Sequence, residues 1–269
     1  MASIDASPGR VMFGAGAELY DFARPGYPPD LFDWLRGTAS LDAASDCFEI
    51  GAGTGQATFP VLAYPVRSLL AIEPDHALAD RLIASGAGDA RLRVAIEPFE
   101  TCRLPLAAFD FGFAATSLHW LRRMKAFDLV LAALRPGGSF AAWWNVYHDP
   151  SSPDAFARAT AHVFSGIEEA PSRTAVRPPF ALDINARMGE MRAAGFVDVR
   201  HALFRWTEAF TPARLAGLYA TFSRVRMAPA ETRAHLLENL ETVAEALARE
   251  SGGEIRRDIV TSVFCGHRP

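Results

Sequence analysis

Short apolar runs and stretches with helical spacing alternate along the first half of this chain. The apolar runs are bounded by glycine, proline or polar residues and predict strands at about 46–50, 68–72, 91–96, 109–115 and 138–146. Helical spacing predicts helices near 29–37, 55–63, 75–85 and 125–134. Strands that alternate with helices in this way form a parallel sheet with helices on both faces.

The second half of the chain has a different pattern. Residues 147–182 are rich in proline around one short helical stretch, AFARATAHVF. The sequence INARMGEMRAAGF then predicts a helix that ends at Gly195, and VDVRHALFRW predicts a strand. A long amphipathic helix is predicted over 231–250 and a final strand over 259–267.

The stretch DCFEIGAGTG carries the first predicted strand directly into a glycine-rich turn. Gly51, Gly53 and Gly55 permit the positive φ angles and the close backbone approach that a nucleotide-type cofactor needs. A dinucleotide fingerprint has its third glycine one residue later, where this chain has Gln56, so NAD is disfavoured. The second predicted strand ends near Glu73, whose carboxylate can accept both hydroxyls of a ribose.

Composition narrows the class of protein further. The chain has 269 residues, half of them apolar, which suits one large Rossmann-like core better than two equal domains. A net charge of -4 and a pI of about 6.0 favour neither a nucleic-acid nor a membrane partner. Because the N-terminus lacks a signal-peptide pattern and no apolar run is long enough to span a bilayer, we expect a cytoplasmic protein. We expect it to be either a monomer or a homodimer.

Cysteine and lysine usage adds little chemistry. Cys47, Cys102 and Cys265 are far apart, so they are expected to be small buried hydrophobic residues rather than metal ligands or a disulfide framework. Lys125 is the only lysine, and most of the arginines are explained by base composition. No metal site is predicted.

Together, FEIGAGTGQAT and AIEPDHAL resemble the class I S-adenosylmethionine-dependent methyltransferases. Residues 94–121 and 134–145 match later motifs of that family in the correct order, and 20–35 resembles the lead-in of its small-molecule branch, methyltransferase type 11, which includes trans-aconitate methyltransferase-like proteins. The resemblance covers 20–146 and returns faintly in the final strand. It implies a Rossmann-like α/β fold with a seven-stranded, mostly parallel sheet, helices on both faces, an antiparallel last strand and a helical cap.

The resemblance also implies a division of one domain, 1–269, into four parts. These are an N-terminal lead-in over the cofactor (1–40), a cofactor-binding core (41–146), a cap insertion (147–182) and C-terminal strands and helices that complete the sheet and the cap (183–269). The alternative for 147–182 is a surface crossover that does not contact the substrate.

Residues expected to bind S-adenosylmethionine follow from the same resemblance. They are Tyr20, Arg24, Glu49, Gly51, Ala52, Gly53, Glu73, Pro74, Phe99, Glu100 and Thr116. Glu49 either holds the glycine turn or meets the ammonium group, and Arg24 either pairs with the cofactor carboxylate or lies on a helix surface. Many relatives have an aspartate for the adenine amine where this chain has Pro98, so Glu97 or Glu100 would have to replace it.

His119 and Trp120 are expected at the open end of the cofactor, where the methyl acceptor binds. Trp120 would form part of the pocket wall. His119 could be a base, a hydrogen-bond donor to the substrate or a structural histidine. One of Trp143 and Trp144 should be in the core, with Asn145 and Tyr147 facing the pocket. No covalent nucleophile is required, because methyl transfer depends on alignment and the exclusion of water.

These observations predict methyl transfer to a small molecule, with S-adenosylhomocysteine as the second product. An oxygen acceptor is favoured, and a carboxylate is attractive because Arg173, Arg177 and Arg205 fall in the region expected to cap the site. The alternatives are an NAD-dependent oxidoreductase and a cofactor-binding protein without transferase activity.

Overall fold

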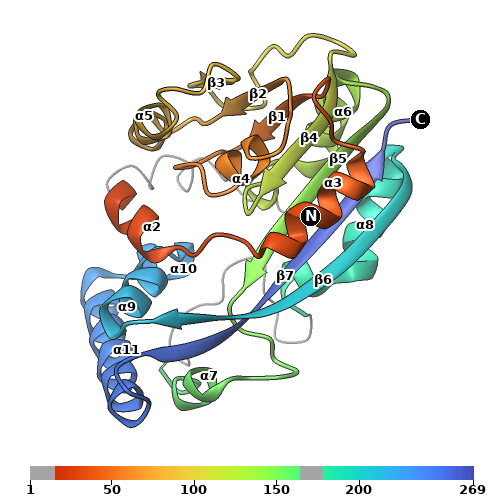
Figure 1. Cartoon of the computed structure of the whole chain (residues 1–269). Helices are drawn as coiled ribbons and strands as arrows, with labels where there is room; N and C mark the ends of the chain where they lie inside the picture. Colours follow the sequence, from red (N-terminus) through yellow and green to blue (C-terminus); the bar gives the residue numbers. More distant parts are fainter. Residues whose placement is uncertain (1–15, 164–177) are drawn as a thin grey trace.

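A seven-stranded sheet forms the centre of the computed structural model, which describes residues 16–163 and 178–269 (Figure 1). The strands are β1 (Asp46–Ile50), β2 (Ser68–Ile72), β3 (Leu92–Ala95), β4 (Phe109–Ala115), β5 (Leu134–Val146), β6 (Val197–Phe210) and β7 (Ile255–His267). Their order is β3-β2-β1-β4-β5-β7-β6, with β1 to β5 parallel and β7 antiparallel to both of its neighbours. This confirms the predicted Rossmann-like sheet with its antiparallel last strand.

Helices cover both faces of this sheet. In the described part of the chain they are α2 (Ala17–Ala23), α3 (Pro29–Ala39), α4 (Thr58–Leu62), α5 (His76–Ser85), η2 (Leu118–Trp120), α6 (Arg123–Ala133), α7 (Ala155–Ala159), η3 (Phe180–Leu182), α8 (Ile184–Ala194), α9 (Pro212–Ala220), α10 (Ser223–Arg226) and α11 (Ala230–Glu250). Leu35 of α3 and Val61 of α4 belong to the apolar cluster of one face, which also contains Trp143. Phe127 of α6 and Met191 of α8 belong to the cluster of the other face.

Several helix ends follow directly from the sequence. Proline occupies the first position of α3, where no N–H is needed. Asp75 caps α5 by accepting from the N–H groups of Ala77 and Leu78. Gly195 ends α8 with φ +106°, a conformation that favours glycine, as the sequence predicted.

A third apolar cluster lies beyond the sheet, where β6 and β7 extend as a two-stranded ribbon toward α9, α10 and α11 (Figure 1). Leu218 of α9 and Leu240 of α11 meet Phe156 of α7 and Ala23 of α2 in this cluster. Helices from the lead-in, the 147–182 region and the C-terminal part of the chain therefore share one core.

Some boundaries differ from the sequence-based expectation. The helix expected over AFARATAHVF ends as α7 at Ala159, where the hydroxyl of Thr160 donates to the carbonyl of Phe156 at 2.7 Å. Strand β5 begins at Leu134 rather than near 138, because Leu134 already pairs with Phe109 before a register shift. The structure also contains α2, α9 and α10, which the periodicity of the sequence did not predict.

Cys47 and Cys265 are buried free thiols, as predicted, while Cys102 is half-buried. Within residues 16–163 and 178–269, no cluster of three or more histidine, cysteine or acidic side chains could hold a metal ion. No helix in those same ranges is long and apolar enough to cross a bilayer.

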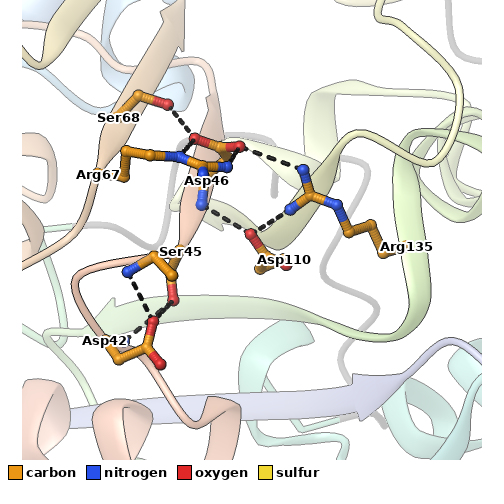
Figure 2. A network of polar contacts seen from close by, with 8 residues as sticks. Asp42, Ser45, Asp46, Arg67, Ser68, Asp110 and Arg135 are labelled. Atoms are coloured by element: carbon orange, nitrogen blue, oxygen red, sulfur yellow. Dashed lines mark hydrogen bonds and ion pairs between the residues drawn. The ribbon is translucent and has the colours of Figure 1, made fainter.

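Charged side chains connect the amino ends of β1 and β4, opposite the glycine turn (Figure 2). Asp46 accepts from Arg67, from Ser68 Oγ at 2.7 Å and from Arg135 Nη2 at 3.2 Å. Asp110 accepts from Arg135 and from the backbone N–H of Asp46 at 2.8 Å. The Arg67 guanidinium holds the pKa of the Asp46 carboxyl well below its usual range.

Replacing Asp46 by asparagine is therefore expected to lower the free energy of unfolding at pH 7 by about 1 kcal/mol, a modest value because Arg67 is largely exposed. A depressed folded-state pKa stabilises the protein above the unfolded pKa of about 3.9 and loses that effect as the pH falls below it. Urea titrations at pH 7 and at the lowest pH where the wild type stays folded should show the difference shrinking. Equal stability of the two proteins at pH 7 would contradict this.

Candidate functional site

A cavity of about 370 Å³ opens at the carboxyl ends of β1, β2, β4 and β5. Small-molecule sites commonly measure about 300–1,000 Å³ and lie at this edge of α/β sheets. The predicted site residues that line it are Tyr20, Arg24, Gly51, Gly53, Glu73, Pro74, Phe99, Glu100, Thr116, His119 and Trp120. The other two, Glu49 and Ala52, line a smaller cavity that adjoins it beneath the glycine turn.

The glycine turn is held against the end of β2. The N–H groups of Gly51 and Ala52 donate to the carbonyl of Ile72 at 2.8 and 3.2 Å. Gly51 and Gly53 have φ values of +69° and +60°, and a Cβ on Gly51 would lie 2.6 Å from the Cβ of Ser117. Position 51 therefore requires glycine for both its backbone angle and its close contact.

Glu73 connects the glycine turn to the helix that follows β2. Its Oε2 accepts from the N–H of Gly53 at 2.8 Å, and its Oε1 accepts from the N–H of Asp75 at 2.9 Å. Burial raises the pKa of this carboxyl. Because each carboxylate oxygen has a second lone pair, Glu73 can hold the turn and still accept hydrogen bonds from a ligand in the cavity.

Glu49 lies at the end of β1 and is fully buried. The hydroxyl of Thr58 donates to its Oε2, and burial raises the pKa of the carboxyl to about 8. Its place in the smaller cavity, with Ala52 and Arg24, is compatible with either predicted role, support of the turn or contact with an ammonium group.

Arg24 ends α2 and lies in the wall of both cavities rather than on an outer helix face. Its Nε donates to Thr221 Oγ1 at 2.8 Å, and its guanidinium carbon lies 5.1 and 5.2 Å from the ring centres of Phe222 and Tyr20. No carboxylate in the described part of the chain forms an ion pair with it. The guanidinium is thus available to an anionic ligand group.

The turn after β3 provides the wall near the predicted adenine position. Phe99 is almost fully buried and stacks on Phe48 with ring centres 6.4 Å apart. Pro98 and Glu100 line the cavity, whereas Glu97 does not. Of the two acids that could replace the missing aspartate, Glu100 is therefore the one at the cavity.

His119 and Trp120 lie on η2, just after Thr116, which has a positive φ of +56° at the end of β4. The indole N–H of Trp144 donates to His119 Nδ1 at 3.0 Å. Burial, together with the positive charges of Arg24 and Arg123, lowers the pKa of His119 to about 4. The imidazole is therefore neutral at physiological pH.

One of the two neighbouring tryptophans, Trp143 and Trp144, was expected to lie in the core. Trp143 is fully buried and stacks on Phe113 at 5.3 Å, whereas Trp144 lines the cavity. Asn145 and Tyr147 also line it, although the Asn145 amide is engaged by the carbonyl of Gly26 and by Thr261.

Several lining aromatics were not found from the sequence. Phe180, Tyr219 and Phe222 come from segments without a family motif, and the aromatic cluster in LYATF was the available signal. Among the cap arginines, Arg205 pairs with Asp149 at 2.9 Å and does not line the cavity. Arg173 and Arg177 lie outside the described residues.

A parallel sheet with a glycine turn after its first strand and a cavity over its strand ends defines a Rossmann-like protein with a nucleotide-type cofactor site. Residues 48–142 match the family described as a methyltransferase domain, methyltransferase type 11. The chain is 23% identical over 253 residues to an uncharacterised methyltransferase of Schizosaccharomyces pombe, covering 93% of this chain and 94% of the relative. It is 26% identical over 245 residues, 90% of each protein, to an uncharacterised methyltransferase of Mycobacterium tuberculosis.

Solved structures share the fold. A candidate type II methyltransferase of Anaeromyxobacter dehalogenans has a TM-score of 0.60 at 20% identity, with 91% of this chain and 97% of that chain covered. Phosphoethanolamine N-methyltransferase 2 of Haemonchus contortus, solved with phosphomonomethylethanolamine and S-adenosylhomocysteine, has a TM-score of 0.57 at 14% identity, covering 100% of this chain and 61% of the other. Together these findings support an S-adenosylmethionine-dependent methyltransferase, and the chain has the fold of the class I enzymes. None of these findings supports an NAD-dependent oxidoreductase.

Proposed function

We propose that this methyltransferase acts on a small molecule and methylates an oxygen of a carboxylate. The observation that carries the proposal is the charge of the cavity wall. Among the described lining residues, the acids are Glu73 and Glu100, both on the side predicted for ribose and adenine. The other described lining residues include aromatic rings and Arg224 but no further acid, an environment that favours an anion over a protonated amine.

The residues at the first side fit S-adenosylmethionine. Glu73 has lone pairs for the ribose hydroxyls, Gly51 and Gly53 allow close backbone approach, and Arg24 lacks a carboxylate partner among the described residues. When bound, the cofactor would supply a methyl group that is bonded to a positively charged sulfur. Transfer of the methyl group to the acceptor would break this bond and leave the sulfur as a neutral thioether. We infer that Glu100 and Phe99 border the adenine and that Tyr20, Pro74 and Thr116 complete the wall.

A carboxylate acceptor suits what the other lining residues can do. An ionised carboxylate oxygen can accept a methyl group without losing a proton, so the chain need not provide a general base. Trp120, Phe180 and Trp144 line the cavity and would exclude water from the reacting atoms. The chain then aligns the reactants and excludes water, and these two effects can lower the activation free energy by several kcal/mol.

The acceptor class can be tested with matched pairs of small molecules. Each carboxylic acid is assayed beside its primary amide, together with phenols and amines, and S-adenosylhomocysteine and the methylated product are measured by mass spectrometry. We expect turnover of an acid to its methyl ester and no turnover of the matched amide. Turnover of amines but of no acid would contradict the carboxylate proposal, whereas tight cofactor binding without any turnover would favour a binding protein without transferase activity.

The proposal assigns the 147–182 region, with α7 and η3 in its described part, to the cap over the acceptor. Pro179 and Phe180 line the cavity, which supports this role over that of a distant surface crossover. A cytoplasmic location, the state of monomer or homodimer and the absence of a nucleic-acid partner stay predictions from the sequence.

A further inference from the structure

We propose that Trp144 fixes His119 as a hydrogen-bond donor to the methyl acceptor, and that His119 is not a general base. The inference deepens the proposed function and rests on it for the identity of the acceptor group. It begins with the 3.0 Å contact between Trp144 Nε1 and His119 Nδ1. An indole N–H can only donate, so His119 Nδ1 must present a lone pair. A neutral imidazole carries one N–H, which in this ring is therefore on Nε2.

The Nε2–H group is free to meet a ligand. His119 lines the cavity, and no residue of the described ranges forms a hydrogen bond with its Nε2. The ring is held by aromatic neighbours, with its centre 5.0 Å from that of Trp120 and 6.1 Å from that of Phe180. A fixed tautomer on a fixed ring gives a donor with a defined direction.

Proton uptake by this ring is opposed by its surroundings. A second proton would have to bind Nδ1, where it would face the N–H of Trp144. Among the described residues, two charged groups act on the ring: Arg24 at the end of α2, and Arg123 of α6, which is paired with Glu190 of α8. Both are arginines and disfavour an imidazolium, in agreement with the lowered pKa. The ring nitrogen that a base would use is thus already occupied.

The acceptor must therefore offer a lone pair to His119. A carboxylate has two oxygens, so one can accept from Nε2–H while the other receives the methyl group. A protonated amine has no lone pair for this contact. The donor explains how an anionic acceptor could be oriented without deprotonation by His119.

The tautomer can be measured without any substrate by NMR of the imidazole nitrogens in the full chain labelled with ¹⁵N-histidine. The chain has seven histidines, and the His119 signals are identified as those that are missing from the spectrum of His119→Gln. We expect His119 to be the Nε2–H tautomer and to stay neutral down to a pH of about 5. Trp144→Phe keeps an aromatic ring but removes the donor, so His119 should become a mixture of tautomers and titrate at least about one pH unit higher.

Trp206→Phe is the matched control. The Trp206 indole donates to Thr261 Oγ1 at 2.9 Å and does not line the cavity, so its loss should leave the His119 signals unchanged. An Nδ1–H tautomer in the wild type would overturn the proposal, as would a His119 signal that is insensitive to Trp144→Phe.

Kinetics with a turned-over acceptor then separate donor from base. The amide N–H of glutamine can replace the Nε2–H donor, so His119→Gln should retain kcat/KM within about 10-fold, while His119→Ala should lose about 100-fold. A base role predicts equal losses in both variants and a wild-type rate that falls as an imidazole protonates. If the acceptor is not a carboxylate, the NMR result still stands, so failure of the proposed function is distinguishable from failure of this inference.

Discussion

Replacing Glu73 by alanine is expected to weaken binding of S-adenosylhomocysteine by about 100-fold or more. The variant removes the proposed acceptor of two ribose hydroxyls, and charge-assisted hydrogen bonds contribute about 1.5–3 kcal/mol each. It also leaves the N–H groups of Gly53 and Asp75 without the carboxylate that holds them. The loss of affinity should therefore include a contribution from a less ordered glycine turn.

Calorimetric titration measures this effect, and circular dichroism checks that the variant is folded. Glu97→Ala is the matched control, because Glu97 follows the neighbouring strand β3 but does not line the cavity. Its affinity should stay within a few-fold of the wild type. A folded Glu73→Ala protein with wild-type affinity would place the ribose elsewhere.

Replacing Arg24 by methionine is expected to reduce affinity for S-adenosylhomocysteine by about 10- to 100-fold, the range expected for loss of one charge-assisted pair. Affinity for 5′-methylthioadenosine, which lacks the amino-acid part of the ligand, should change little. This difference isolates the carboxylate contact from any general change in the cavity.

Arg81→Met provides the control for the position of α2. Arg81 of α5 pairs with Glu18 and Asp21 of α2 at 3.1 and 3.7 Å, but it does not line the cavity. Its replacement should affect the two ligands equally and weakly. If Arg24→Met weakens both ligands to the same extent, Arg24 does not bind the carboxylate.

Features that are local in the sequence could be predicted well. The apolar runs of β1, β2 and β4 are bounded by polar residues or glycines, and Gly195 ends α8 at the expected residue. The predicted start of β5, near residue 138, was wrong. Pro136 and the glycines after it suggested a turn before the strand, whereas the pairing of β5 with β4 begins at Leu134 and continues across a register shift.

Some residues of the candidate site could be predicted from the sequence, and others could not. Gly51, Gly53 and Glu73 belong to two short sequence motifs at the ends of neighbouring strands, so their position at one cavity edge could be inferred. Phe222 and Tyr219 reach the cavity through long-range packing of α9 and α10, which no local pattern encodes. The contact between Trp144 and His119 depends on side-chain direction and determines chemistry that the sequence left open.

Thermal unfolding with added ligands tests the central claim, that the cavity at the glycine turn binds S-adenosylmethionine. A ligand at about 100 times its Kd stabilises the folded state by about 2.7 kcal/mol. We predict that S-adenosylhomocysteine raises the Tm of the wild type, that the same concentration leaves the Tm of Glu73→Ala almost unchanged, and that NADH has no effect on either protein. A rise with NADH and none with S-adenosylhomocysteine would contradict the account.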